Sequence, residues 1–115
     1  MRTDIRLIAL DLDGTLLDSQ KRLSVRNEKA LKECIARGIY IVPCTGRIWG
    51  GVPEFLRTLP GIRYAITTNG AIVEDVAEHK ILDERKLGCA QAIDILEMAG
   101  KFHTMYDAYV NGCAY

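Results

Sequence analysis

The pattern of apolar residues at the start of the chain predicts a parallel β-α-β unit. Residues 5–11 carry an apolar run, typical of a strand buried on both faces of a parallel sheet. Apolar side chains then recur at helical spacing over residues 25–35, between Ser24 as the expected N-cap and Gly38 as the expected helix stop. A second apolar run follows over residues 39–43. Because the return loop is very short, we expect a parallel strand pair with a right-handed crossover.

The pattern after this unit predicts a less regular continuation. Over residues 48–59, two glycines and a proline favour a loop or a late helix start. A third strand is predicted over residues 64–67, and a small hairpin follows, with strands over residues 71–73 and 80–82 and a polar tip between them. The side chains expected to face inward from the irregular segment are Val52, Phe55, Leu56 and Leu59.

The pattern changes again near residue 84, which predicts two parts, residues 1–84 and residues 85–115. A new amphipathic helix is expected over residues 90–101. Residues 102–109 then alternate between apolar and polar, as a half-buried strand does. Asn111 and Gly112 are typical of a hairpin turn that opens a further strand.

Composition narrows the class of protein. The 115 residues carry 15 basic and 15 acidic side chains, without a basic stripe. We therefore expect neither a nucleic-acid partner nor a membrane partner, and a cytoplasmic location is the default. The four cysteines form no Cys-x-x-Cys pair, so we expect reduced thiols.

Candidate chemistry begins at the end of the first strand, where Asp11 and Asp13 precede Gly14. Open α/β sheets bind ligands at the carboxyl ends of their strands. On an extended chain the two carboxylates would point to the same side and repel each other, which a bound cation would relieve. A calcium loop of the EF-hand type is excluded, because Thr15 and Arg22 stand where ligands are required. A plain strand-to-turn exit remains an alternative.

A second candidate site follows the second strand, where Thr45, Gly46 and Arg47 stand together. A threonine hydroxyl and nearby amides can hold phosphate oxygens. The alternative is an ordinary strand-to-helix turn with an N-cap. Arg47 could contact a substrate or pair with a surface acid, and the neighbouring Cys44 thiol could be reactive.

The segment 11–16, Asp-Leu-Asp-Gly-Thr-Leu, resembles the first motif of the haloacid dehalogenase-like (HAD) phosphohydrolases. The resemblance implies that Asp11 is the nucleophile that becomes an aspartyl phosphate and that Asp13 is the general acid/base. It also implies a Mg²⁺ site at Asp11 and Asp13, with the backbone carbonyl of the latter as a ligand, and phosphate contacts from Leu12 and Gly14.

The segment 45–47 resembles the second motif of the same family, in the form typical of its Cof-type subgroup. The resemblance implies phosphate or substrate binding by Thr45, Gly46 and Arg47, and it places Asn69 near the substrate entrance. Asn-Gly at this position is otherwise a hairpin-turn signal. The implied fold is α/β: a three-layer Rossmann-like parallel sheet, of which only the first strands are present, with residues 85–115 opening an inserted α/β cap.

The later motifs of this family, a lysine and an acidic pair, are not found in the 115 residues. We therefore expect a Mg²⁺-dependent phosphatase acting on small phosphorylated metabolites, present as an incomplete chain that is inactive alone and holds Mg²⁺ weakly. The first strand should offer an open edge that invites self-association. The alternatives are a non-catalytic remnant or interaction domain and, less well matched to these motifs, a receiver-like domain.

Overall fold

The computed structural model describes residues 4–115, apart from the side chain of Ala114. The chain divides into two compact units, with the division between Glu84 and Arg85. Each unit is described by itself below.

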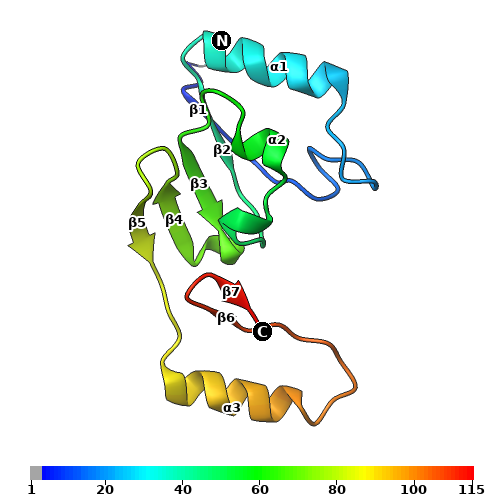
Figure 1. Ribbon diagram of the computed structural model, residues 1–115, viewed down its shortest axis with the longest axis vertical. Coiled ribbons are helices and arrows are strands. Elements are labelled where there is room, and N and C mark those ends of the chain that lie inside the picture. Colours follow the sequence, from blue (N-terminus) through cyan, green and yellow to red (C-terminus); the bar gives the residue numbers. More distant parts are fainter. Residues whose placement is uncertain (1–3) are drawn as a thin grey trace. The chain divides into compact units, whose positions relative to one another are not determined.

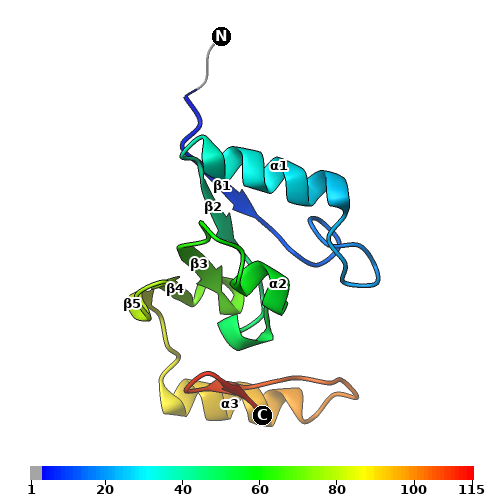
Figure 2. The same ribbon diagram turned by 45° about the horizontal axis from the view of Figure 1, so that its top comes forward.

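The first unit begins with the predicted β-α-β arrangement. Strands β1 (Leu7–Leu10) and β2 (Tyr40–Pro43) are parallel and pair in register along their whole length. Helix α1 (Val25–Ala36) connects them and lies along the strand pair in both views (Figures 1 and 2). Ser24 is its N-cap, because the Ser24 hydroxyl accepts a hydrogen bond from the Asn27 amide at 3.1 Å. The predicted cap and the parallel pairing are confirmed.

The rest of the first unit extends the sheet. The elements are the 3₁₀ turn η1 (Trp49–Gly51), helix α2 (Glu54–Arg57), strand β3 (Tyr64–Thr67), the 3₁₀ turn η2 (Thr68–Gly70) and strands β4 (Ile72–Asp75) and β5 (Lys80–Glu84). Strand β3 joins β2 through a parallel bridge between Cys44 and Ile66, and β3, β4 and β5 form an antiparallel meander. The third strand and the small hairpin are confirmed, and the helix of the irregular segment starts late, as expected.

One hydrophobic core holds this unit together. Its buried members come from the turn after β1, from α1, α2 and β2, and from the loops on either side of α2: Leu12, Leu16, Leu17, Leu31, Ile41, Val52, Leu56 and Ile62. Three positions expected to face inward are wrong. On the apolar stripe of α1, Val25 is 84% exposed and Ala30 is exposed, and after it Phe55 is 42% exposed. At about 100° per residue, Val25 lies roughly 240° around the helix from Leu31, and Phe55 lies a quarter-turn from Leu56.

The prediction that the first strand is buried on both faces is wrong. Leu7 is 52% exposed and Ala9 is exposed, whereas Ile8 and Leu10 are half-buried against the core. The cause is that α1 and α2 contribute to a single core on one face of the sheet. Among residues 4–115, β1 forms its ladder with β2 alone, which leaves the expected open edge.

The second unit contains helix α3 (Cys89–Ala99) and a hairpin of β6 (Tyr109–Val110) and β7 (Cys113–Ala114). Asn111 and Gly112 both have positive φ, as the predicted hairpin turn requires. The predicted strand over residues 102–109 is wrong except at its last residue. An alternating pattern forms a strand only where a neighbouring strand can pair with it, and the described partner is two residues long.

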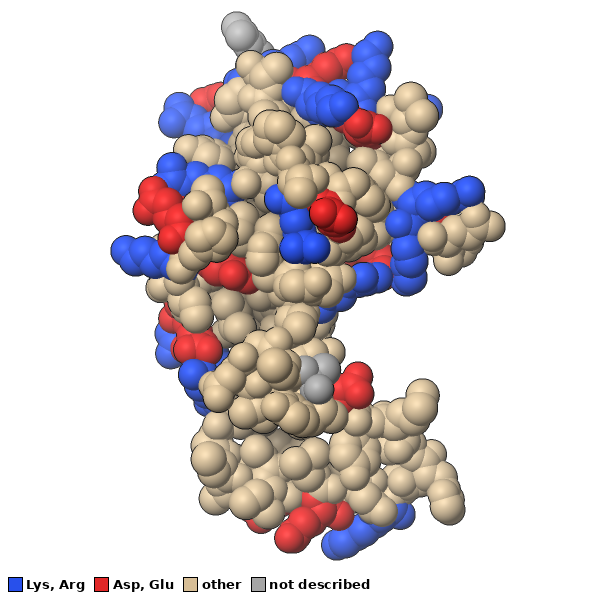
Figure 3. Space-filling model, in the orientation of Figure 1, with Lys and Arg blue, Asp and Glu red and all other residues tan. Residues whose placement is uncertain are grey.

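The surface of the two units differs in charge. Figure 3 shows basic and acidic side chains interspersed over the first unit, whereas the visible surface of the second is mostly uncharged. Helix α3 has no buried residue, and its larger apolar side chains are exposed: Ile93, Ile95, Leu96 and Met98. Across the described residues, no helix is both long and apolar enough to cross a membrane.

An ion pair at the end of β4 makes the stability of the first unit depend on pH. Asp75 is only 4% exposed, and its carboxylate accepts hydrogen bonds from Arg63 Nε at 2.9 Å and from the Glu78 amide at 3.1 Å. Burial opposes ionisation, but the bonds from Arg63 and the backbone outweigh it and lower the pKa of Asp75 below its usual 3.8. This stabilisation is therefore present above pH 3.8 and is lost as the pH falls through the lower, folded-state pKa.

We expect Asp75→Asn to be less stable than the wild type at neutral pH, with a gap that narrows on acidification. The asparagine keeps the shape but loses the charge that Arg63 stabilises. Urea unfolding of both proteins at neutral pH and at about pH 3 measures the gap. Arg63→Met should show the same narrowing, and a gap that does not change with pH would contradict the assignment.

Candidate functional site

The first candidate segment is a tight turn that follows β1. The Leu16 amide donates to the Asp11 carbonyl at 3.3 Å, and the Leu17 amide donates to the Leu12 carbonyl at 2.8 Å. Gly14 has φ +79°, a conformation that other residues adopt only with strain. The strand ends at Leu10, so both aspartates lie beyond it, and Asp13 forms an isolated parallel bridge with Leu17.

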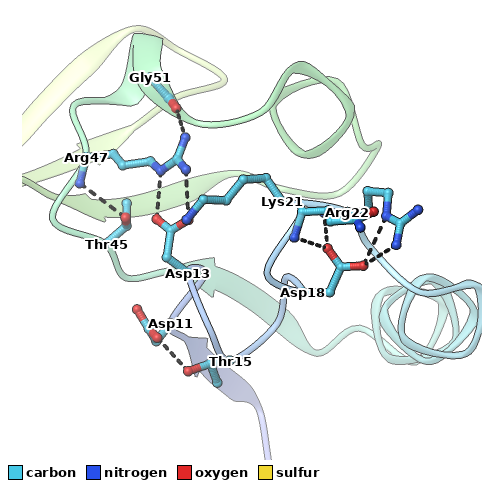
Figure 4. A network of polar contacts seen from close by, with 10 residues as sticks. Asp11, Asp13, Thr15, Asp18, Lys21, Arg22, Thr45, Arg47 and Gly51 are labelled. Carbon is cyan, nitrogen blue, oxygen red and sulfur yellow. Dashed lines mark hydrogen bonds and ion pairs between the residues drawn. The ribbon is translucent and has the colours of Figure 1, made fainter.

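The two aspartates have different partners, as Figure 4 shows. The exposed carboxylate of Asp11 accepts a hydrogen bond from the Thr15 hydroxyl at 2.6 Å. The Asp13 carboxylate accepts two bonds from Arg47, both at 2.8 Å, from Nε and Nη2. Lys21 Nζ lies 2.7 Å from the same carboxylate. Asp13 is thus held by two cations, one from each of two separate loops.

These contacts stabilise the charged form of Asp13. The bidentate hydrogen bonds from Arg47 contribute most, and Lys21 adds to them, so the pKa of Asp13 falls well below its usual value. Asp13 in turn raises the pKa of Arg47. Of the two roles left open for Arg47, the structure shows pairing with an acid, and that acid is itself a candidate site residue.

Thr45 anchors the second candidate loop. Thr45 is 6% exposed, and its amide donates to the Ile66 carbonyl on β3 at 2.9 Å. Its hydroxyl accepts a hydrogen bond from the Arg47 amide at 3.1 Å. This bond fixes the backbone of Arg47, whose side chain binds Asp13. Thr45 is not a helix N-cap, because the following 3₁₀ turn is preceded by Ile48.

The loop after β3 packs directly against this segment. The Asn69 amide donates to the Thr45 carbonyl at 3.1 Å, and the Thr68 amide donates to the Arg47 carbonyl at 3.0 Å. Thr68 and Asn69 both have positive φ, which is strained for residues with side chains. A Cβ atom added to Gly46 would lie 2.8 Å from Asn69 Oδ1. The Asn-Gly pair therefore forms the turn between β3 and β4 and also lies beside the candidate loop.

Electrostatics connect Asp11 to the second strand. Burial raises the pKa of the Cys44 thiol, and the negative charge of Asp11 raises it further. The Cys44 amide donates to the Leu10 carbonyl at 2.7 Å, immediately before Asp11. The carboxyl ends of β1 and β2 therefore meet, as predicted. A thiol with a raised pKa stays protonated at neutral pH, which argues against a reactive Cys44.

The remaining predicted residues are placed as follows. Leu12 is completely buried, so only its backbone could contact a ligand. Gly14 is exposed, and its Cβ position is open. Sequence reasoning missed two polar contacts, those of Thr15 and Lys21. Thr15 lies four residues after the aspartate it contacts, which is a signal that the sequence shows. Nothing in the spacing shows that the loop of residues 17–23, the flap, returns Lys21 to Asp13.

The described residues do not complete a metal centre. Within residues 4–115, no group of three or more His, Cys, Asp or Glu side chains lies together in a way that could hold a metal ion. One of the two candidate carboxylates is already bound by two cations. The residues present therefore do not by themselves fit a Mg²⁺ site.

Comparisons with known proteins all point to one family of hydrolases. A family model described as haloacid dehalogenase-like hydrolase matches residues 8–115. The phosphatase YwpJ of Bacillus subtilis is 32% identical over 115 residues, covering 96% of this chain and 39% of that protein. The 5-amino-6-(5-phospho-D-ribitylamino)uracil phosphatase YcsE of B. subtilis is 40% identical over 84 residues, covering 73% and 33%.

Solved structures share the fold. A haloacid dehalogenase-like hydrolase from B. subtilis superposes with a TM-score of 0.73 at 37% identity, over 84% of this chain and 34% of that one. The chain thus spans 33% to 39% of the length of these three proteins.

Proposed function

Because the chain belongs to the haloacid dehalogenase-like hydrolases, we propose that it is the nucleophile-bearing part of a phosphatase acting on small phosphorylated metabolites. Its relatives are named phosphatases, and one is named for a phosphorylated ribityl compound. The fold is the α/β fold of that family, represented here by its first strands.

One observation supports this proposal most strongly. Asp13, from the turn after β1, and Arg47, from the loop after β2, are joined by two hydrogen bonds of 2.8 Å. The Thr45 hydroxyl accepts a hydrogen bond from the Arg47 amide, and the Asn69 amide donates one to the Thr45 carbonyl. Residues predicted separately from three strand ends thus form a single connected network, at the edge where open α/β sheets bind ligands.

The chemistry we propose follows from the residue types. An Asp11 carboxylate oxygen attacks phosphorus, and the bond between phosphorus and the alcohol oxygen breaks. Once protonated, Asp13 gives that proton to the departing alcohol and, as a carboxylate, later takes one from the water that hydrolyses the aspartyl phosphate. The Thr45 hydroxyl and the amides around Gly46 hold phosphoryl oxygens.

We also propose Mg²⁺ as the cofactor, although the described residues alone do not supply enough ligands to bind it. Asp11 and the Asp13 carbonyl are oxygen ligands of the kind that Mg²⁺ prefers, but the described residues supply no third acidic group beside them. The ion, which neutralises phosphoryl charge when bound, would need ligands from outside the described residues. We accordingly propose that residues 1–115 are inactive alone.

A chimera tests the function directly. Residues 1–115 are joined to the part of YwpJ that follows its matched region and assayed with p-nitrophenyl phosphate and Mg²⁺, beside the 115-residue chain. We expect metal-dependent turnover from the chimera and none from the chain alone. A folded but inactive chimera would contradict the phosphatase proposal, whereas robust turnover by the chain alone would contradict only its inactivity.

A second candidate is a non-catalytic interaction domain. It is favoured by one edge of β1, which pairs with no strand within residues 4–115 and could pair with a second copy of the chain, and by the exposed side chain of Leu7. A folded but inactive chimera would favour this candidate.

We also propose a cytoplasmic location. All four cysteines are free, as is typical of proteins in a reducing compartment.

A further inference from the structure

We infer that Lys21, at the tip of the flap formed by residues 17–23, is a phosphoryl-binding residue that shares with Arg47 an anion site now occupied by the Asp13 carboxylate. The identity of the anion rests on the proposed function. The site itself rests on the contacts described here.

The geometry of the pair is that of an oxyanion site. Arg47 presents Nε and Nη2 to the two oxygens of one carboxylate, and Lys21 Nζ reaches one of the same oxygens at 2.7 Å (Figure 4). The guanidinium fork matches carboxylate and phosphate oxygens equally well. The third guanidinium nitrogen, Nη1, donates to the Gly51 carbonyl at 2.7 Å, so the fork is held in place from behind.

The hydrogen bonds within the flap position Lys21 beside the Asp13 carboxylate. Its two limbs pair at Leu17 and Leu23, and the Asp18 carboxylate accepts the amides of Gln20 and Arg22 at 2.8 and 2.9 Å. These bonds fix a turn in which Lys21 has φ +61°, a conformation that costs free energy in a residue with a side chain. The turn therefore holds the lysine where its amine meets Asp13.

Charge and exposure make exchange of the anion feasible. Two cations face one carboxylate, so a positive charge is left over for an incoming anion. The side chains of Lys21, Asp13 and Arg47 are 55%, 34% and 30% exposed, which lets solutes reach them without opening the core. A phosphate dianion carries more charge than a carboxylate and can compete for both cations. Binding would also free Asp13 from its partners, as proton transfer by this residue requires.

The inference predicts an internal competition that a mutant cycle can measure. In Asp13→Asn the internal carboxylate is gone, so inorganic phosphate should bind the 115-residue chain about tenfold more tightly than it binds the wild type. In the double variant that adds Lys21→Met, this gain should fall by about threefold. Amide shifts of residues 45–47 in NMR titrations report binding, with EDTA present and ionic strength held constant with chloride.

Lys32→Met is the matched control. Lys32 also makes a close, partly exposed ion pair, with Glu28 at 2.6 Å on helix α1. Adding it to Asp13→Asn should leave the phosphate affinity unchanged. An unchanged affinity in Asp13→Asn would overturn the anion site, and a gain that survives Lys21→Met would overturn the role of Lys21. Well-dispersed spectra establish that each variant is folded.

This readout is independent of turnover. An inactive chimera would contradict the phosphatase proposal but leave an anion site in place. A failed mutant cycle would remove Lys21 from the site while leaving Asp11 as the proposed nucleophile.

Discussion

Asp11→Asn is expected to lower turnover by the chimera by roughly four orders of magnitude or more, because an amide cannot attack phosphorus in place of a carboxylate. The exposed Asp11 side chain makes its hydrogen bond with Thr15, and an asparagine can accept the same bond. The thermal midpoint should therefore change little. Steady-state rates with p-nitrophenyl phosphate, beside melting curves, separate a loss of chemistry from a loss of structure.

The control for this variant is Asp4→Asn. Asp4 precedes β1 at the end opposite to the site, is exposed and pairs with Arg6 at 3.0 Å. The same chemical change there should leave the rate within about twofold, because it touches neither the core nor the network around Asp13. Substantial activity in Asp11→Asn would remove this residue as the nucleophile.

Leu12→Ala is expected to cost about 3 kcal/mol of unfolding free energy, because the side chain is completely buried in the core. That loss is a large share of the stability of a small unit. Leu12 lies between the two aspartates, and its carbonyl accepts the Leu17 amide that closes the turn. Urea unfolding of the 115-residue chain measures the effect.

Leu7→Ala provides the comparison for this measurement. It deletes the same atoms from a strand residue whose side chain is 52% exposed, so it should cost about 0.5 kcal/mol. If the two variants lose equal stability, Leu12 is not at the centre of the core as described.

The local elements could be predicted from sequence because their signals are local. The Ser24 hydroxyl caps α1, and Gly38 with φ +77° follows the helix end. The parallel pairing followed from the short return between two apolar runs. These features depend on backbone preferences and periodicity, which a single sequence displays.

Burial and long-range contacts could not be predicted in the same way. The exposed face of β1 depends on which elements cover the sheet, and an apolar run alone does not reveal this. The strand expected over residues 102–109 lacks an extended partner in the described residues. The contact between Lys21 and Asp13 arises only from the three-dimensional path of the turn, which a single sequence does not display.

The same distinction applies to the candidate site. The residue types at the ends of β1 and β2 indicated which groups could do chemistry, and Thr45 and Arg47 do lie in one network with Asp13. The sequence alone did not show which charged groups of that network pair with one another. Two cations face one carboxylate, and this pairing arises only from the fold.

Because Gly46 and Asn69 approach each other closely, the residues tolerated on one loop depend on those present on the other. With a Cβ atom at position 46 only 2.8 Å from Asn69 Oδ1, even alanine would push the amide aside. Substituting one residue thus changes what the other can be, although they lie on different loops. Any engineering of either loop must treat Gly46 and Asn69 as one coupled pair.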